Sequence, residues 1–182
     1  MGHEPGSPEY LPPDQFVVEV FSELSEDSIW RRWREVNTVL RLSMLTGLPM
    51  QLEAVLNMLC DFANEIVQYD SALVYFWDEA LEQMSLRTSR EIDSISEPLT
   101  HGNIFNFWVN KYGRPLMVTR GDHPQADPIL DDLRVASALI IPLVVNNHTL
   151  GSMQLFSRTA QAFSTEDAQL LWILALVSEN ML

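Results

Sequence analysis

The sequence predicts an α+β domain whose mainly antiparallel sheet has helices on one face and an irregular segment on the other. Two pairs of strand-like runs, each joined by a short turn, predict the sheet: residues 72–77 with 83–89, and 135–145 with 148–157. Helical periodicity before the first pair and after the last pair predicts the helices. The polar stretch between the two pairs predicts the irregular segment.

Composition restricts the classes of function that fit the chain. Its 182 residues include 25 acidic and 11 basic side chains, a formal net charge of −14. A field of this sign repels phosphate, which argues against a nucleic acid or an anionic membrane as partner. The single cysteine forms no internal disulfide, which fits the cytoplasm. We expect no transmembrane segment and no secretory signal peptide.

The first 50 residues are predicted to hold a tail and a helix. Residues 1–28 begin with a Pro- and Gly-rich stretch, so we expect a flexible tail before a single domain over residues 29–182. A helix is predicted over residues 29–46, with Ser28 as its cap and Gly47 at its end. The helix has a heptad seam and a second apolar stripe. Either one stripe covers the domain while the other meets a partner helix, or both belong to one wide core face. The seam residues are Ile29, Trp33, Val36 and Leu40.

A second helix is predicted over residues 50–68, where apolar side chains recur on one face. Cys60 lies beside that face, one turn from Leu56 and Ala63. Because a free cysteine packs as a small apolar residue and no basic residue is near in sequence, we expect a buried structural thiol.

The first strand pair is predicted to have one buried and one half-exposed member. Residues 72–77 are apolar throughout, so we expect a strand buried on both faces. Residues 83–89 alternate, which predicts Met84, Leu86 and Thr88 on one face.

The segment from Arg90 to about Val135 is predicted to be irregular, with three short elements. We expect a helix over residues 103–112, a strand over residues 115–118 and one or two helical turns over residues 129–135. The apolar stripe of the short helix is predicted to be Ile104, Phe107 and Trp108.

The last hairpin has distinctive turn chemistry. Asn146 and Asn147 can supply the positive φ of a tight turn between two apolar runs. Gly151 indicates a close backbone approach or a bulge. Pro142 cannot donate to a strand ladder, so a bulge or an unpaired side is expected there.

The final helix is predicted to begin at a capping box made by Ser164 and Asp167. No stop signal follows it in the sequence, so we expect it to lead toward an output domain. One series at helical spacing is expected to meet a partner helix: Leu171, Leu174, Val177 and Met181.

The order of these elements resembles the GAF domain, a small-molecule sensory module of bacterial signalling proteins and cyclic-nucleotide phosphodiesterases. The residues that carry the resemblance are Gly113-Arg114-Pro115 with Asp122, the run 135–143 ending in Ile-Pro-Leu, residues 150–155, and Phe163 to Asp167. It implies a GAF/PAS-like sheet, a pocket between the sheet and the irregular segment, and a homodimer formed through the terminal helices.

Several activities of that family are disfavoured by the residues present. Cyclic-nucleotide-binding members carry Asn-Lys and Asp-Glu around a Phe, whereas Ser157-Arg158 and Ala168 stand at three of those positions here. Bilin-binding members use a cysteine in the irregular segment, and the chain has none after Cys60. A lone cysteine on a core helix also argues against methionine sulfoxide reduction.

The resemblance implies that the pocket holds an unidentified small molecule. Two alternatives stay open for these residues: the aromatic rings either line the pocket or fill a closed core, and the arginines either face the cavity or lie at the surface. An arginine facing the cavity would indicate an anionic ligand. The candidate lining residues are Tyr75, Trp77, Arg87, Phe105, Trp108, Arg134, Leu139 and Met153.

These observations predict a non-catalytic regulatory domain without a metal or resident cofactor. It would bind a small molecule, pair with a second copy, or do both, and so control a linked output domain such as a histidine kinase or diguanylate cyclase. A structural dimerisation module is one alternative, for which a fully packed interior would be the sign. A haem- or redox-linked sensor with His101 or His123 as axial ligand is another. No catalytic triad, phosphate-binding loop or metal-ligand spacing is recognisable.

Overall fold

The structure is a computed structural model that describes residues 51–182, apart from the side chains of residues 180 and 181. The predicted tail (residues 1–28) and first helix (residues 29–46) lie outside the described residues. The predicted seam of that helix lies there too: Ile29, Trp33, Val36 and Leu40.

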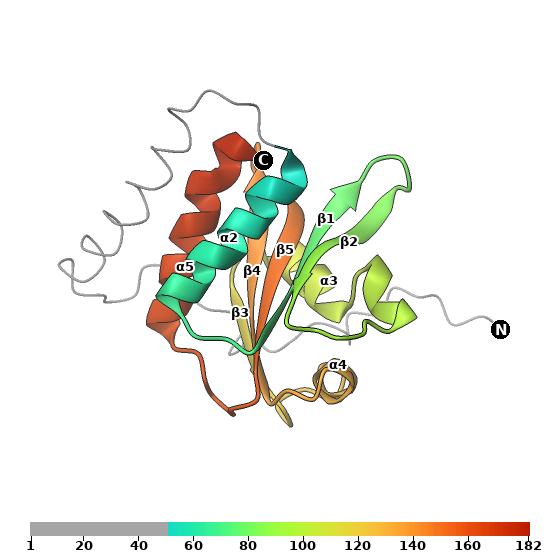
Figure 1. The fold of residues 1–182 in the computed structure, drawn as a ribbon, viewed down its shortest axis with the longest axis vertical. Coiled ribbons are helices and arrows are strands. Elements are labelled where there is room, and N and C mark those ends of the chain that lie inside the picture. The colour runs from blue at the N-terminus through green and yellow to red at the C-terminus, as the bar shows by residue number, and fades with distance from the viewer. Residues whose placement is uncertain (1–50) are drawn as a thin grey trace.

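A five-stranded sheet forms the middle layer, and every pair of neighbouring strands is antiparallel (Figure 1). The strand order is β2-β1-β5-β4-β3. The strands are β1 (Ser71–Asp78), β2 (Gln83–Arg90), β3 (Leu116–Thr119), β4 (Ser137–Val145) and β5 (His148–Ser157). The predicted α+β class, both hairpins and the short strand are confirmed.

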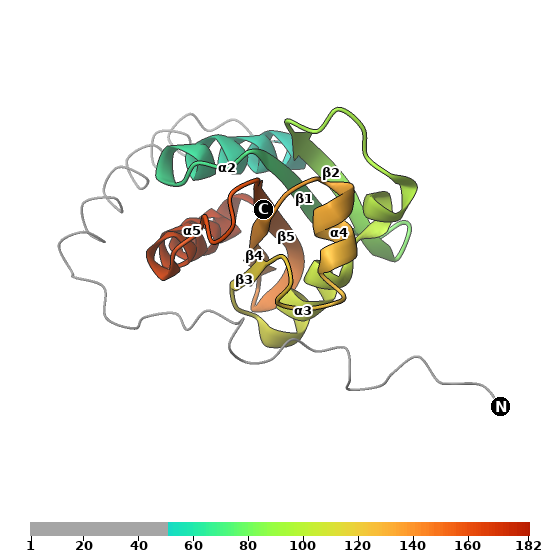
Figure 2. The ribbon, with the colours of Figure 1, turned by 90° about the horizontal axis from the view of Figure 1, so that it is seen from below.

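Both faces of the sheet are covered, one by two long helices and the other by the segment between the hairpins with its short helices (Figure 2). One face packs against α2 (Leu52–Ile66) and α5 (Thr165–Val177), which is followed by η4 (Ser178–Met181). The other face packs against η3 (Glu97–His101), α3 (Ile104–Tyr112) and α4 (Asp127–Asp132). The stretch 90–102, predicted as a loop, thus contains the short helix η3.

Each face has its own apolar core. Between the sheet and α2 with α5, fully buried residues such as Leu56, Leu139 and Leu171 form the first core. Between the sheet and α3 with α4, Tyr75 and Phe156 belong to a second core. Each large apolar side chain removed from water stabilises the fold by about 1.5–3 kcal/mol.

The β4–β5 hairpin confirms the predicted turn. Asn146 and Asn147 have φ of 51° and 62°, the left-handed values that a two-residue turn needs. Gly151 also confirms a close approach, since a Cβ there would lie 2.3 Å from the Tyr75 carbonyl oxygen. The irregularity expected at Pro142 lies one residue further on, between Leu143 and the next residue.

The buried face of α3 differs from the predicted stripe. Phe107 is 52% exposed, whereas Phe105, Trp108 and Val109 are buried. The helix also buries a polar residue, Asn106, against the sheet. The other two residues of the predicted stripe pack against the second core, so the prediction is wrong only at Phe107.

A β-bulge in β2 overturns the predicted position of Thr88. Val74 pairs with Thr88 and the next residue of β1 pairs with Leu86, so Arg87 is the extra residue. Met84 and Leu86 pack against the second core, but the Thr88 hydroxyl donates to the Asn57 side chain of α2 (2.9 Å). The bulge shifts the alternation after Leu86 and turns Thr88 to the opposite face.

Candidate functional site

Buried aromatic rings lie between the sheet and the irregular segment, where the resemblance implies a ligand. Three of the predicted lining residues, Tyr75, Phe105 and Trp108, meet there and are fully buried. The Phe105 ring centroid lies 5.8 Å from that of Trp108 and 6.4 Å from that of Phe156. Pairs at these separations add about 0.5–1.5 kcal/mol beyond their burial. The rings therefore act as core packing at this face.

The Tyr75 hydroxyl ties the irregular segment to the sheet. It donates to the Leu99 carbonyl of η3 (2.6 Å) and accepts from the Asn103 side chain (3.4 Å). Burial raises the pKa of Tyr75 well above its usual range, so the phenol stays neutral. Its position is that of a structural link.

A buried polar network lies beside these rings. Gln154, fully buried in β5, accepts from the Asn103 side chain (2.9 Å) and donates to the Asn106 side chain (3.2 Å). Asn106 in turn donates to the Ser152 hydroxyl (2.8 Å). Asn103 and Asn106 also form the capping box at the start of α3. Sequence reasoning missed this network, although Ser152 and Gln154 are the polar residues within an apolar strand.

The prediction that Leu139, Met153 and Arg87 line the pocket is wrong. Leu139 and Met153 face the opposite side of the sheet and belong to the first core. The alternation along β4 and β5 assigns their side chains to two faces of the sheet but does not tell which face meets α3. The prediction therefore took the residues of the opposite face as pocket lining.

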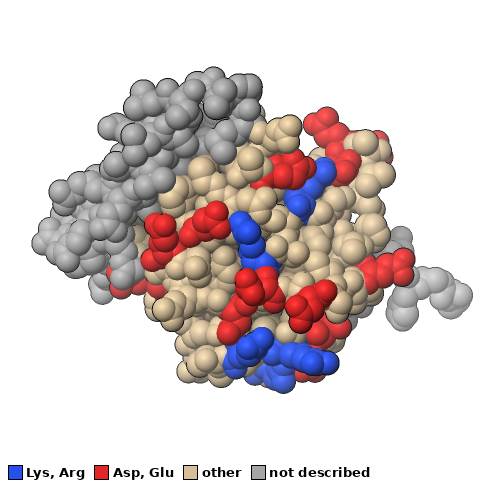
Figure 3. Space-filling model, viewed as in Figure 1, with Lys and Arg blue, Asp and Glu red and all other residues tan. Residues whose placement is uncertain are grey.

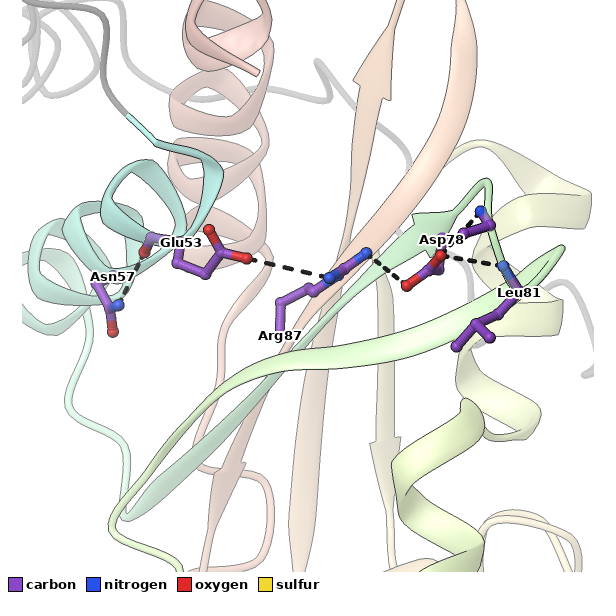
Figure 4. A network of polar contacts seen from close by, with 6 residues as sticks. Glu53, Asn57, Asp78, Leu81 and Arg87 are labelled. Carbon is purple, nitrogen blue, oxygen red and sulfur yellow. Dashed lines mark hydrogen bonds and ion pairs between the residues drawn. The ribbon is translucent and has the colours of Figure 1, made fainter.

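Arg87 projects toward α2, on the face of β2 opposite to Leu86 (Figure 4). Its guanidinium donates to the Asp78 carboxylate (2.9 Å) and lies 4.0 Å from the Glu53 carboxylate. These pairs connect β2 with the end of β1 and the start of α2, and they leave Arg87 outside any pocket on the α3 face.

Trp77 and Arg134 line two separate pockets at the margins of the domain. The Trp77 pocket has a volume of about 480 Å³ and is bordered by Trp77, Met84, His101, Phe107, Asn110 and Thr149, among others. The Arg134 pocket has a volume of about 650 Å³ and carries charges of both signs, including Asp70, Glu91, Asp132, Arg134 and Arg158. Arg134 has a φ of 55° just after α4.

The predicted partner-facing residues of α5 lie mostly inside the domain. Leu171 and Leu174 are fully buried in the first core, and Val177 packs against it half-buried. The Met181 side chain lies outside the described part of the structure. Leu176, at 37% exposure, is the large apolar residue that α5 presents outward. The prediction for Leu171 and Leu174 is wrong because a helix apolar all round gives periodicity no face to select.

Cys60 is confirmed as a buried structural thiol. It lies in the first core, and burial raises its pKa to about 11. A thiol this rarely ionised is a poor nucleophile. The hydroxyl of Tyr69 donates to the Cys60 carbonyl (3.0 Å), which anchors α2 to the chain leading into β1.

Each of the two candidate haem ligands contacts a neighbouring side chain of the domain. The His123 ring packs edge-on against Trp108, with 4.9 Å between centroids. The His101 ring bonds to the Gln83 amide nitrogen through Nδ1 (3.2 Å). Within residues 51–182, no group of three His, Cys, Asp or Glu residues is placed to hold a metal ion.

Basic and acidic side chains lie side by side on the described part of the face formed by α2 and α5. Figure 3 shows the Lys and Arg side chains of that face next to Asp and Glu, as in the Arg90–Asp61 pair at 3.0 Å. None of the described helices is both long and apolar enough to cross a bilayer.

Comparison with known proteins identifies the fold. A family model for the GAF domain matches residues 49–177. A search of curated proteins gave no significant match.

Solved structures share the architecture at low sequence identity. A domain of a putative two-component sensor histidine kinase from Sinorhizobium meliloti 1021 is 16% identical, with a TM-score of 0.57 over 72% of this chain and 90% of that one. The GAF domain of a two-component sensor histidine kinase from Bacillus halodurans is 20% identical, with a TM-score of 0.57 over 72% and 95%. Free methionine-R-sulfoxide reductase from Neisseria meningitidis is 16% identical, with a TM-score of 0.65 over 90% and 95%.

The family match spans all five strands of the described sheet and the helices on both of its faces, and these neighbours share that fold. The chain belongs to the GAF domain family.

Proposed function

We propose that this chain is a non-catalytic regulatory module of a cytoplasmic signalling protein. It pairs with a second copy through the α2 and α5 layer and passes changes in packing to a linked output domain, such as a histidine kinase or a diguanylate cyclase. Support for the signalling role comes from the sensor kinases among the structural neighbours.

The observation that carries the pairing is the composition of α5. Every residue from Leu170 to Val177 is apolar. The sheet and α2 bury Leu171 and Leu174, whereas Leu176 remains 37% exposed. A helix that is apolar all round is normally covered on all sides, so a second copy is the expected cover for the outward side.

The connection from β5 to α5 gives the module a route for a signal. β5 lies at the centre of the sheet, and α5 begins eight residues after it at the Ser164 cap. A shift of β5 against β1 or β4 would therefore tilt the paired helices. A ligand or partner can drive such a shift only if it binds the two packing arrangements of the paired helices with different affinities.

The filled interior favours the variant in which the module pairs without an enclosed ligand. Tyr75, Phe105 and Trp108 are fully buried between the sheet and α3. Thiol-based reduction is also disfavoured, because Cys60 is buried in the first core and its pKa is raised to about 11. This is the difference we expect from the reductase among the neighbours.

Light scattering after size-exclusion chromatography tests the pairing. We expect a dimer at about 100 μM, which Leu176→Glu converts to a monomer because a carboxylate would be buried without a partner. Leu81→Glu is the matched control, since Leu81 is 60% exposed in the β1–β2 turn. A monomeric wild type, or a Leu176→Glu dimer as stable as the control, would contradict the proposal.

A further inference from the structure

Two exposed aromatic side chains line the Trp77 pocket. Trp77 is 41% exposed and Phe107 is 52% exposed, and both border the same volume of about 480 Å³. The other large aromatic residues near this end of the domain, such as Tyr75 and Trp108, are fully buried. Large apolar groups gathered at one exposed place commonly mark a binding surface.

The two rings come from separate elements that are held rigidly. Trp77 lies near the end of β1, where Asp78 accepts from the amides of the following turn (3.0 and 3.1 Å). Phe107 projects from the first turns of α3, whose start is fixed by the capping box of Asn103 and Asn106. Because both supports are fixed in the free protein, binding between them costs little conformational entropy.

The polar groups of the pocket divide into engaged and free ones. Asn103 and Asn106 are occupied by Gln154 and Ser152 and serve as a floor. The side chains of Asn110 and Thr149 make no hydrogen bond within the described part of the chain.

His101 adds a directed donor to this pocket. The Gln83 amide nitrogen can only donate, so Nδ1 of His101 accepts that bond. The other ring nitrogen, Nε2, makes no hydrogen bond within residues 51–182 and is open to a ligand. Together with Asn110 and Thr149, His101 offers a neutral ligand both donors and acceptors.

Charge narrows the class of ligand further. None of the residues that line the pocket is Asp, Glu, Lys or Arg. The net charge of −14 repels an anion from the whole surface. The volume of about 480 Å³ lies within the range of small-molecule sites.

We propose that the Trp77 pocket binds an uncharged, planar aromatic compound that carries a carboxamide or an equivalent neutral donor–acceptor group. The ring packs against Trp77 and Phe107, and the neutral group bonds to His101, Asn110 or Thr149. The site lies outside the filled interior and does not depend on pairing through α5.

Fluorine NMR of the full chain labelled with 5-fluorotryptophan tests this site with three probes of one shape. Nicotinamide is neutral, nicotinate is an anion and 1-methylnicotinamide is a cation. The signal of Trp77 is assigned by its loss in Trp77→Phe. We expect nicotinamide to shift that signal saturably, and nicotinate to bind at least about tenfold more weakly.

Variants separate the pocket from unspecific ring contacts. Phe107→Ala and Asn110→Ala should each weaken nicotinamide at least about fivefold, and Phe107→Tyr should retain binding because it keeps the ring. Leu81→Ala is the control, an exposed apolar side chain outside the pocket. Circular dichroism checks that each variant is folded.

Three results would overturn the proposal. They are the absence of saturation by nicotinamide below about 20 mM, an affinity unchanged in both Phe107→Ala and Asn110→Ala, and a preference for either charged probe over nicotinamide.

Discussion

Replacing Gly151 by Ala tests the closest backbone approach in the sheet. An added Cβ would lie 2.3 Å from the Tyr75 carbonyl oxygen and 2.8 Å from Cδ2 of Phe76. Since unstrained carbon contacts are about 3.5 Å, β5 and β1 would have to separate by roughly 1 Å at this end. Overpacking of this kind costs about 1–3 kcal/mol, and the loss of one ladder hydrogen bond adds about 1 kcal/mol.

The net loss expected from Gly151→Ala is about 2–3 kcal/mol of unfolding free energy. This net value includes a gain of about 0.4–1 kcal/mol, because alanine restricts the conformations of the unfolded chain more than glycine does. With a urea m-value of about 2 kcal/mol/M, the unfolding midpoint measured by circular dichroism should fall by about 1–1.5 M.

Gly113→Ala is the matched comparison for that measurement. Gly113 has a φ of 61°, and no atom lies within 4 Å of an added Cβ. Its cost is therefore backbone strain alone, about 1 kcal/mol, or about 0.5 M in urea midpoint. Equal losses in the two variants, or a Gly151→Ala midpoint within about 0.3 M of wild type, would refute the reasoning from backbone contact.

Three further perturbations have defined outcomes. Gln154→Leu should lower the unfolding free energy by about 2 kcal/mol in urea titration, because Asn103 and Asn106 each lose a buried hydrogen-bond partner; a neutral effect would show that the network contributes nothing net. Ser164→Ala should cost about 1 kcal/mol in the same titration by removing the cap of α5; the restoration expected in Ser164→Thr controls for it, and a cost no larger in Ser164→Ala than in Ser164→Thr would contradict it. Burial raises the pKa of Cys60 from 9.0 to about 11, so the folded state favours the neutral thiol. The stabilisation that this gives is complete below pH 9 and is lost as the pH rises through 11. Between pH 8.5 and 11, the wild type should therefore lose about 2 kcal/mol more unfolding free energy than Cys60→Ala, and parallel curves for the two proteins would show that the thiol is not buried.

The parts of the fold that local chemistry determines could be predicted from the sequence. Asn146 and Asn147 form the turn because asparagine tolerates positive φ, and Gly151 permits an approach that no side chain allows. Ser164 and Asp167 satisfy the first amides of α5 whatever the rest of the domain does. Such signals act within a few residues, so a single sequence contains them in full.

The side that each residue faces depends on partners that are distant in sequence. One bulge at Arg87 turns Thr88 to α2, and nothing within β2 announces it. Leu139 and Met153 alternate correctly, but only the packing of α2 and α5 decides which face they join. For α5 itself, the sheet and α2 determine which side of the helix is buried, because Leu171 and Leu176 are equally apolar.

The candidate site was harder to predict than the fold for the same reason. Tyr75, Phe105 and Trp108 were predicted to meet, and they do, as fully buried rings of the second core. The residues of the Trp77 pocket come from β1, β2, η3, α3 and β5, so only the assembled domain brings Trp77 and Phe107 together.

The central position of β5 also constrains how the domain folds. β1 and β4 pair with β5 and not with each other, so the β1–β2 and β3–β4 ladders stay separate until the last strand inserts. During synthesis, the edges that β5 will occupy on β1 and β4 are therefore exposed until the chain beyond His148 has emerged. Open strand edges of this kind invite association with other chains. Folding should accordingly be slow and dominated by long-range contacts, and a chain ending at Asn147 should aggregate instead of forming a smaller stable sheet.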